Sequence, residues 1–331
     1  YKSIACGVLL ALTATSCDLD YNPVDSYSDV TEGVDKTDEK PIFNSVQDVE
    51  TSMVTLHKKF RDQQEHWYVD KLLIGDAHSD NAYAGTTGAE VVPYETNSIE
   101  GSNSVLKRDW DRFLGDIAEA NRIIVGCEQL KALSDSERGK YQSQAKIFRA
   151  MVMFDMVRLW GNFPVITTVG GDITEDNVEE MYPTYFPPQN TAEEAYAQIE
   201  KDLTEAVENP NTPTNDASDK SILTKSVARA MLAKVYAEKP LRDYAKVIKY
   251  ADELAADGFD LVEDFSDLWA YDTEKKDCRV RNTKEAILEA HFPPGSGNWC
   301  TWMFGRNLSN WDEALPGPNG FTPSREPYPP L

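Results

Sequence analysis

Apolar side chains recur at helical spacing through most of the first 258 residues. Near the start of this region they follow one another at steps of three and four positions: Val46, Val49, Met53, Leu56 and Phe60. This spacing places them on one face of a helix. Ser45, followed three residues later by Asp48, is typical of a helix N-terminus. We therefore expect an amphipathic helix that begins just after Ser45.

Two longer helices are predicted at about residues 106–127 and 137–160. The segment 137–160 carries two apolar stripes, one with Tyr141, Phe148, Val152, Met156 and Leu159 and the other with Ile147, Met151 and Phe154. A helix with two apolar stripes is packed on two sides, so this one is expected to be central. The sequence GNFP at 161–164 ends it, and a loop-rich insert is expected as far as Gln189.

Three more helices are predicted, at 191–207, 224–239 and 243–258. Thr191 and Glu194 have the spacing of a capping box at the start of the first. The second is rich in alanine, which lets neighbouring helices approach closely.

These helices pair into repeat-like units. Residues 224–257 form a helix–turn–helix segment of 34 residues, which is the length and pattern of a tetratricopeptide repeat. The pairs 106–127 with 137–160 and 191–207 with 224–239 look like looser copies of this unit. We therefore predict a mainly all-α fold, a tetratricopeptide-like scaffold with a loop-rich ligand-binding face and few short strands.

The pattern changes beyond Phe265. The segment EAILEAHF at 285–292 is predicted to be a short strand, and proline and glycine are frequent after it. This region also holds several tryptophans, among them Trp269, Trp299 and Trp302. Aromatic residues on irregular loops are candidates for a binding surface. The alternative, that each covers an apolar edge of the scaffold, stays open.

The charge of the chain excludes one class of partner. The 331 residues include 33 basic and 56 acidic side chains, a formal net charge of −23. Such a field repels phosphates, so no nucleic-acid partner is expected. A soluble surface that resists aggregation explains the same charge without any ligand.

The first residues are typical of an export signal. Lys2 is followed by an apolar run of 11 residues at 4–14, which is too short to span a bilayer. Small residues then lead to Cys17 in the sequence ATSC. This resembles the bacterial lipoprotein signal, in which the cysteine becomes the acylated first residue of the mature protein. We predict a signal peptide at 1–16 and lipidation of Cys17.

The rest of the chain is expected to hold one domain. Residues 17–43 are predicted to be an extended linker because they are acidic and contain proline. The domain at 44–331 would consist of a helical repeat core to about residue 258 and a loop-rich region at 259–331.

The stretch IGDAHSDNAYAG at 74–85 is a polar segment without helical or strand periodicity. Its acidic residues alternate like the first ligands of a calcium loop. However, Asn81 stands where that loop requires glycine, and Thr87 stands where it requires a bidentate glutamate. The chain also lacks the short motifs of serine hydrolases, P-loop proteins, dinucleotide-binding proteins and zinc proteases. We predict no metal, no cofactor and no catalytic residue.

The side chains of the stretch 74–85 can form hydrogen bonds with a polar ligand. Asp80 and Asn81 can bond to hydroxyl groups, and Tyr83 adds an aromatic face with a polar tip. Sugars present such hydroxyls together with apolar ring faces. An Asx-rich turn that satisfies its own backbone is the competing interpretation.

The segment QAKIFRAMVMFDMVRLWGNFPVI at 144–166 resembles the most recognisable part of the SusD/RagB family of surface nutrient-binding lipoproteins. The family pattern A-x-x-x-R-A-x-x-x-F-D-x-x-R-x-[WY]-G-x-x-P is matched by Ala145, Arg149, Ala150, Phe154, Asp155, Arg158, Trp160, Gly161 and Pro164. The stretches CDLDYNP, SDNAYAG, RDWDRFLGDIAEANRII, TKSVARAMLAKVY and NTKEAILEAHF also resemble family members, in the same order.

This resemblance implies a fold and a role. Family members are tetratricopeptide-like scaffolds that bind oligosaccharides, or peptides in some branches, without cleaving them. They sit at the outer membrane as a lid over a SusC-like TonB-dependent transporter. The resemblance implies a cell-surface lipoprotein that is anchored through Cys17 and binds an oligosaccharide. The residues expected to contact the ligand are Asp80, Asn81, Tyr83, Trp269, Trp299 and Trp302.

The motif residues Arg149, Asp155, Arg158 and Trp160 are expected to be structural, because binders of different ligands share them. Family members usually run well beyond this length, so the chain is also expected to be truncated at its C-terminus. The alternatives are a peptide-binding protein of RagB type, a tetratricopeptide protein-interaction scaffold and, less favoured, a surface glycosidase.

Overall fold

The structure is a computed structural model that describes residues 41–292 except 64, 80–88, 172–177, 239, 269–270, 273, 275–276 and 279. Contacts divide the chain into a unit Tyr1–Pro41 and a unit Ile42–Leu331, and the described helices belong to the second unit. The predicted signal peptide, Cys17 and the predicted linker up to residue 40 lie outside the described residues.

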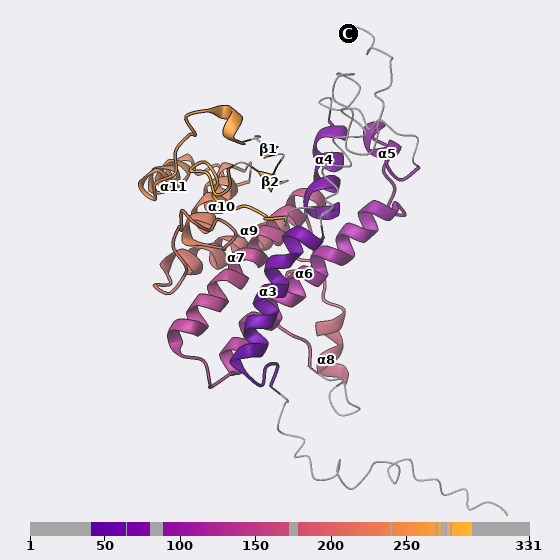
Figure 1. Ribbon diagram of the computed structural model, residues 1–331. Helices are drawn as coiled ribbons and strands as arrows, with labels where there is room; N and C mark the ends of the chain where they lie inside the picture. The colour runs from indigo at the N-terminus through magenta and orange to yellow at the C-terminus, as the bar shows by residue number, and fades with distance from the viewer. Residues whose placement is uncertain are drawn as a thin grey trace, which may run out of the picture. The chain divides into compact units, whose positions relative to one another are not determined.

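The described part of the chain is mainly helical, as predicted (Figure 1). The predicted capping boxes Ser45–Asp48 and Thr191–Glu194 are both formed. The long helices are α3 (Val46–Asp62), α6 (Ser104–Gln129), α7 (Asp135–Trp160), α9 (Ala192–Glu208), α10 (Lys225–Ala237) and α11 (Tyr244–Ala256).

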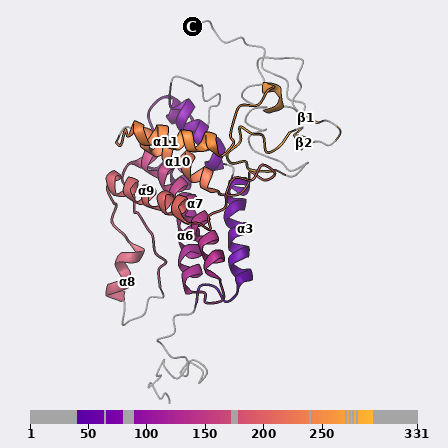
Figure 2. The same ribbon diagram turned by 90° about the vertical axis from the view of Figure 1, so that its left-hand side faces the viewer.

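The long helices pack in sequence order. The hairpin of α6 and α7 is central, α9 packs on α7, α10 on α9, and α11 on α10, while α3 contacts α6 and α7 (Figures 1 and 2). The middle of each apolar stripe of α7 is buried: Phe148, Val152 and Met156 in one stripe, and Ile147 and Phe154 in the other. The predicted mainly all-α scaffold is therefore confirmed. No helix in the described part of the chain is both long enough and apolar enough to cross a membrane.

The stretch 74–85 departs from its prediction. It was expected to have no helical structure, but its first residues belong to a helical run that starts at Glu65. The run alternates π and α turns, so apolar residues do not recur every 3.6 positions and the helix is not visible in the sequence. Its elements are η2 (Glu65–Val69), α4 (Asp70–Leu72) and η3 (Leu73–Ala77), and a short helix α5 (Val92–Glu95) follows after the undescribed residues.

The insert between α7 and α9 contains a helix that the sequence did not predict, α8 (Val178–Tyr185). α7 ends at Gly161, whose φ of 72° lies in the left-handed region that favours glycine. The two ends of the insert meet again at an isolated bridge between Phe163 and Asn190. The insert therefore leaves the scaffold and returns to it at neighbouring positions of the backbone.

The predicted strand at 285–292 is wrong. This segment is irregular in the structure, and its Glu289 amide donates to the Lys220 carbonyl oxygen over 2.8 Å. Its neighbour is the turn-rich connection between α9 and α10, which offers no continuous row of backbone partners. Beyond η4 (Phe265–Leu268), the described strands are β1 (Tyr271–Asp272) and β2 (Asp277–Cys278), which pair antiparallel.

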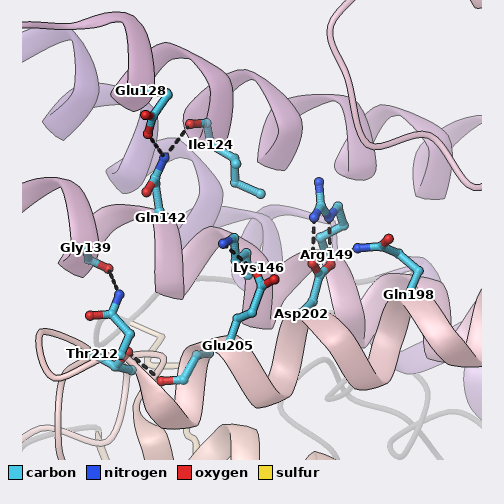
Figure 3. Close-up of polar contacts among 12 residues, drawn as sticks. Ile124, Glu128, Gly139, Gln142, Lys146, Arg149, Gln198, Asp202, Glu205 and Thr212 are labelled. Atoms are coloured by element: carbon cyan, nitrogen blue, oxygen red, sulfur yellow. Dashed lines mark hydrogen bonds and ion pairs between the residues drawn. The ribbon is translucent and has the colours of Figure 1, made fainter.

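A buried ion pair joins α7 to α9 (Figure 3). The Arg149 guanidinium donates two hydrogen bonds to the Asp202 carboxylate, at 2.8 and 2.6 Å, and a third to Asn121 Oδ1 of α6 at 2.7 Å. Gln198 donates to the same carboxylate over 2.9 Å. Both charged side chains are almost completely buried. Arg149 thus links three helices, which agrees with the structural role expected for it.

We predict that Arg149→Met lowers the free energy of unfolding by about 3–5 kcal/mol, because it leaves the Asp202 charge buried and unpaired. Urea denaturation followed by circular dichroism would measure this loss. Lys146→Met is the matched control. It removes the half-exposed pair Lys146–Glu205 from the same interface and should cost less than about 1 kcal/mol. Equal losses in the two variants would contradict the structural role of Arg149.

Candidate ligand-binding cleft

A cleft of about 790 Å³ opens between α3, α7 and two irregular segments of the chain. The irregular walls are the connection 209–224, between α9 and α10, and residues 289–291. The volume lies in the range of pockets that bind small molecules. Two helices therefore provide a rigid side of the cleft, and loops provide the other.

His57 of α3 meets Gln144 of α7 at the wall of this cleft. The Gln144 amide nitrogen donates to the Lys140 carbonyl oxygen over 3.2 Å, which turns its Oε1 toward His57. His57 Nε2 lies 3.1 Å from that oxygen and so acts as the donor. Burial lowers the pKa of His57, and hydrogen bonds to Gln144 and to the backbone of Ser221 oppose this effect only in part. The imidazole is therefore a neutral group that fixes the spacing of two helices.

Asp219 lies near both histidines of the cleft. Its carboxylate accepts hydrogen bonds from the Ser221 hydroxyl at 2.6 Å and the Ser221 amide at 2.9 Å, and these bonds lower its pKa. The negative charge of Asp219 acts on His57 and on His291. His291 Nε2 also lies 3.0 Å from Glu289 Oε2. Two imidazole groups of the cleft thus lie close to carboxylates.

Hydrogen bonds hold the two irregular walls together. Asn282 accepts from the Lys220 amide over 2.9 Å and donates to the Ser218 carbonyl oxygen over 2.6 Å. The Asn282 amide donates to Glu289 Oε2 over 3.1 Å. The segment before residue 292 is therefore fastened to the connection 209–224 and closes one side of the cleft.

The remaining lining mixes charge with apolar surface. Lys58 and Lys140 bring ammonium groups, Asp216 brings a carboxylate, and Phe60 and Tyr141 bring ring surface. Donors and acceptors beside aromatic surface suit a ligand that carries both hydroxyl groups and C–H faces. The charges have both signs, so the cleft is not selective for ions of one sign.

The Ser221 hydroxyl donates to the Asp219 carboxylate and not to a histidine. Ser221 and the described histidines of the cleft therefore do not form a serine–histidine pair of the kind that activates a nucleophile. In the residues that the structure describes, no group of three or more His, Cys, Asp or Glu side chains is placed to hold a metal ion.

The residues predicted to contact a ligand lie outside the described residues. This holds for Asp80, Asn81, Tyr83, Trp269, Trp299 and Trp302. Their role stays a prediction, because the structure neither brings them together nor separates them.

The other motif residues of α7 contact the scaffold. Lys71 Nζ lies 2.5 Å from Asp155 Oδ2, which ties α7 to the helical run before residue 78. Arg158 pairs with Glu238 at 3.1 Å, just beyond the end of α10. The Trp160 ring packs edge-on against Trp110 of α6, with centroids 5.3 Å apart. These contacts agree with the structural role expected for the motif.

An acidic pair lies close to Tyr94 of α5, the short helix that follows the undescribed residues 80–88. The Arg108 guanidinium bonds to Asp70 at 2.5 Å. Its Nε lies 4.0 Å from the buried Asp109 carboxylate, which is beyond hydrogen-bond distance, and both Asp109 oxygens are without a geometric hydrogen bond among the described residues. Burial, with the negative charge of Asp70 as a second cause, raises the pKa of Asp109 to about 8. Both carboxylates also raise the pKa of the buried Tyr94, after burial itself. Asp109 therefore carries its proton at neutral pH.

Sequence analysis missed the cleft. Its residues come from four separate segments, and each segment has an ordinary local explanation. One signal was present: His57 and Gln144 are polar residues beside the apolar stripes of α3 and α7, where a purely structural helix would place hydrophobic side chains.

We predict that the His57 imidazole titrates below 6.5, because burial disfavours its charged form. The stability that this group contributes is fully present above pH 6.5 and is lost as the pH falls through the folded-state pKa. Nitrogen chemical shifts of the ring give the pKa directly. His57→Gln should flatten the loss of stability that sets in as the pH falls below 6.5. An imidazole that titrates at or above 6.5 would contradict the buried, neutral state.

We also predict that Asp109→Asn stabilises the protein at pH 8. The folded protein holds a proton on Asp109 that the unfolded chain releases near pH 3.8, so the wild type loses stability as the pH rises from about 4 to about 8. Asparagine removes this loss, and the gain at pH 8 should be at least about 1 kcal/mol. Urea midpoints at pH 4.5 and 8 would measure it. A variant less stable than the wild type at pH 8 would show that the carboxylate is ionised and paired.

Comparison with known proteins agrees with this architecture. A SusD-like family model, described as starch-binding and associating with the outer membrane, matches residues 25–237. A SusD-like protein of Bacteroides ovatus is 26% identical over 238 residues, which is 68% of this chain and 39% of that protein.

Two solved structures show the same fold. Surface glycan-binding protein A from Bacteroides fluxus matches with a TM-score of 0.61 and 21% identity, covering 80% of this chain and 55% of that one. A laminarin-binding SusD-like protein matches with a TM-score of 0.56 and 20% identity, covering 69% and 48%. This chain thus spans about two fifths of the curated relative and about half of the solved structures. Because the family model covers well over half of the chain, this protein belongs to the SusD-like family.

Proposed function

We propose that this protein binds an oligosaccharide at the outer surface of the outer membrane and passes it, uncleaved, to a SusC-like TonB-dependent transporter. The observation that carries the proposal is the family match over residues 25–237, which includes the central helix α7 and its motif. The description of that family, starch-binding and associating with the outer membrane, supports both the ligand class and the location. The laminarin-binding relative of similar fold supports the ligand class further.

The proposal assigns the anchor and the ligand contacts as well. Cys17 would carry the lipid that holds the protein at the membrane. Two places could receive the sugar. One is the set of residues predicted from sequence, which includes Trp299 and Trp302. The other is the cleft beside α3, whose mixed polar and aromatic lining suits a polyhydroxylated ligand.

We predict saturable binding of a polysaccharide without release of reducing ends. Affinity electrophoresis of the full chain in gels that contain laminarin, soluble starch, xylan or mannan would detect binding, and calorimetry with the matching oligosaccharide would give its affinity. Wild-type protein that binds no glycan in the panel but binds peptides would overturn the proposal in favour of a peptide carrier. New reducing ends would overturn it in favour of a glycosidase.

Two variants locate the ligand. Trp299→Ala with Trp302→Ala removes the predicted aromatic contacts, and Val54→Trp obstructs the cleft from a half-exposed position on its wall. Thr55→Trp is the matched control, since Thr55 is the exposed next residue and does not line the cleft.

Co-purification of the lipidated protein with a transporter barrel from outer membranes tests the delivery step. If no barrel co-purifies, the proposal is restricted to glycan binding.

A further inference from the structure

The insert between α7 and α9 carries a group of exposed apolar side chains. They are Val169, Val178, Tyr182, Tyr185 and Phe186. Exposed apolar patches on soluble proteins mark interaction sites more often than isolated exposed residues do. Three members of this group are aromatic, and we call Tyr182, Tyr185 and Phe186 the α8 aromatic face.

Two aromatic rings of this face, Tyr182 and Phe186, lie together. Tyr182 and Phe186 are four residues apart, so they share one side of the helical segment. Their ring centroids are 4.7 Å apart with 31° between the planes. The Phe186 amide donates to the Tyr182 carbonyl oxygen over 3.1 Å, which continues the helical backbone to the second ring. The side chains are nevertheless 55% and 67% exposed. Two adjacent rings thus present a continuous apolar surface to solvent.

The backbone below this face is braced. The Tyr185 hydroxyl donates to the Gly171 carbonyl oxygen over 2.6 Å. The same ring lies so close to Gly170 that a Cβ there would be 3.2 Å from Tyr185 Cζ, so any side chain would push the ring away. At the base of the insert, the Asn190 side chain accepts from the Val165 amide over 2.9 Å. A braced surface loses little conformational entropy when a ligand binds.

The charge of the insert limits the ligand. Residues 161–190 contain no Lys, Arg or His, and their acidic residues are Asp172, Glu175, Asp176, Glu179 and Glu180. This net negative charge disfavours phosphates, anionic lipid headgroups and acidic sugars. It also leaves the insert without a cation to pair with a carboxylate. An uncharged ligand with C–H faces for the rings does not meet this repulsion and suits the exposed aromatic side chains.

We propose that the α8 aromatic face is a binding subsite for an uncharged oligosaccharide, whose sugar rings stack on Tyr182 and Phe186. The proposal rests on the glycan-binding function proposed above and adds a place and a ligand charge to it. The subsite is separate from the cleft, because α8 and α3 lie on opposite sides of α6 and α7 (Figure 2). Two separate contacts on one chain would strengthen the binding of a long polysaccharide more than that of a short oligosaccharide.

The test uses affinity electrophoresis with the same neutral polysaccharides. Tyr182→Ala with Phe186→Ala should weaken the binding of the polymer roughly tenfold, the loss expected from two aromatic contacts. Tyr182→Leu with Phe186→Leu should weaken it similarly while keeping apolar bulk on the helix. The matched control is Tyr244→Ala with Ile248→Ala on α11, which has the same four-residue spacing and exposures of 60% and 61%. This control should bind like the wild type. Circular dichroism would verify that each variant is folded.

The outcomes separate this proposal from the proposed function. If the wild type binds a polysaccharide and both aromatic variants bind it equally well, the subsite is overturned and the glycan-binding function stands. If the leucine variant alone keeps full affinity, the contact is only apolar and sugar stacking is overturned. Glycan binding that is unchanged, together with loss of a basic envelope protein from the variants, would identify the face as a protein contact and overturn the proposal. A wild type that binds no glycan overturns both proposals.

Discussion

The arrangement of the scaffold depends on the contact between Arg149 and Asp202. α7 packs on both sides, so apolar burial alone would allow it to slide against its neighbours. A bidentate ion pair between buried partners has one satisfactory geometry, and any shift of α9 along α7 would leave two charges unpaired in the interior. Such a pair contributes more to a unique register than to net stability. Asn121 extends the same constraint to α6, so one polar contact fixes the relative positions of three helices.

The positions of both candidate binding surfaces, the cleft and the α8 aromatic face, depend on these three helices. The cleft uses α7 as one wall, with Gln144 little more than one turn before Arg149. The insert that carries α8 leaves the scaffold where α7 ends and returns where α9 begins. A change in the α7–α9 register would therefore displace both surfaces, although no residue of the ion pair contributes to either. The motif residues of α7 hold the helices together, and the residues proposed to contact a ligand are others.

The helices were predictable from sequence because their signals are local. Apolar spacing and caps such as Thr191 with Glu194 place helix boundaries within a few residues. Two predictions from sequence were wrong for physical reasons. The run from Glu65 to Ala77 mixes π and α turns, so its period does not match an ideal helix. The segment 285–292 has the composition of a strand but lies beside a connection that offers one backbone acceptor, Lys220. The cleft was not predictable because helix packing and side-chain contacts such as His57 with Gln144 bring its walls together, and these depend on tertiary structure.

The net charge of −23 is compatible with the uncharged ligand that we propose. Asp219 beside the cleft keeps its negative charge, which hydrogen bonds from the Ser221 hydroxyl and amide stabilise. Asp109 is protonated instead, which removes one buried charge beside Asp70. The surface charge that remains disfavours anions at long range, while hydrogen bonds and ring faces act only at contact. An uncharged polyhydroxylated ligand does not meet the long-range repulsion that anions meet, so for such a ligand hydrogen bonds and ring contacts decide whether it binds.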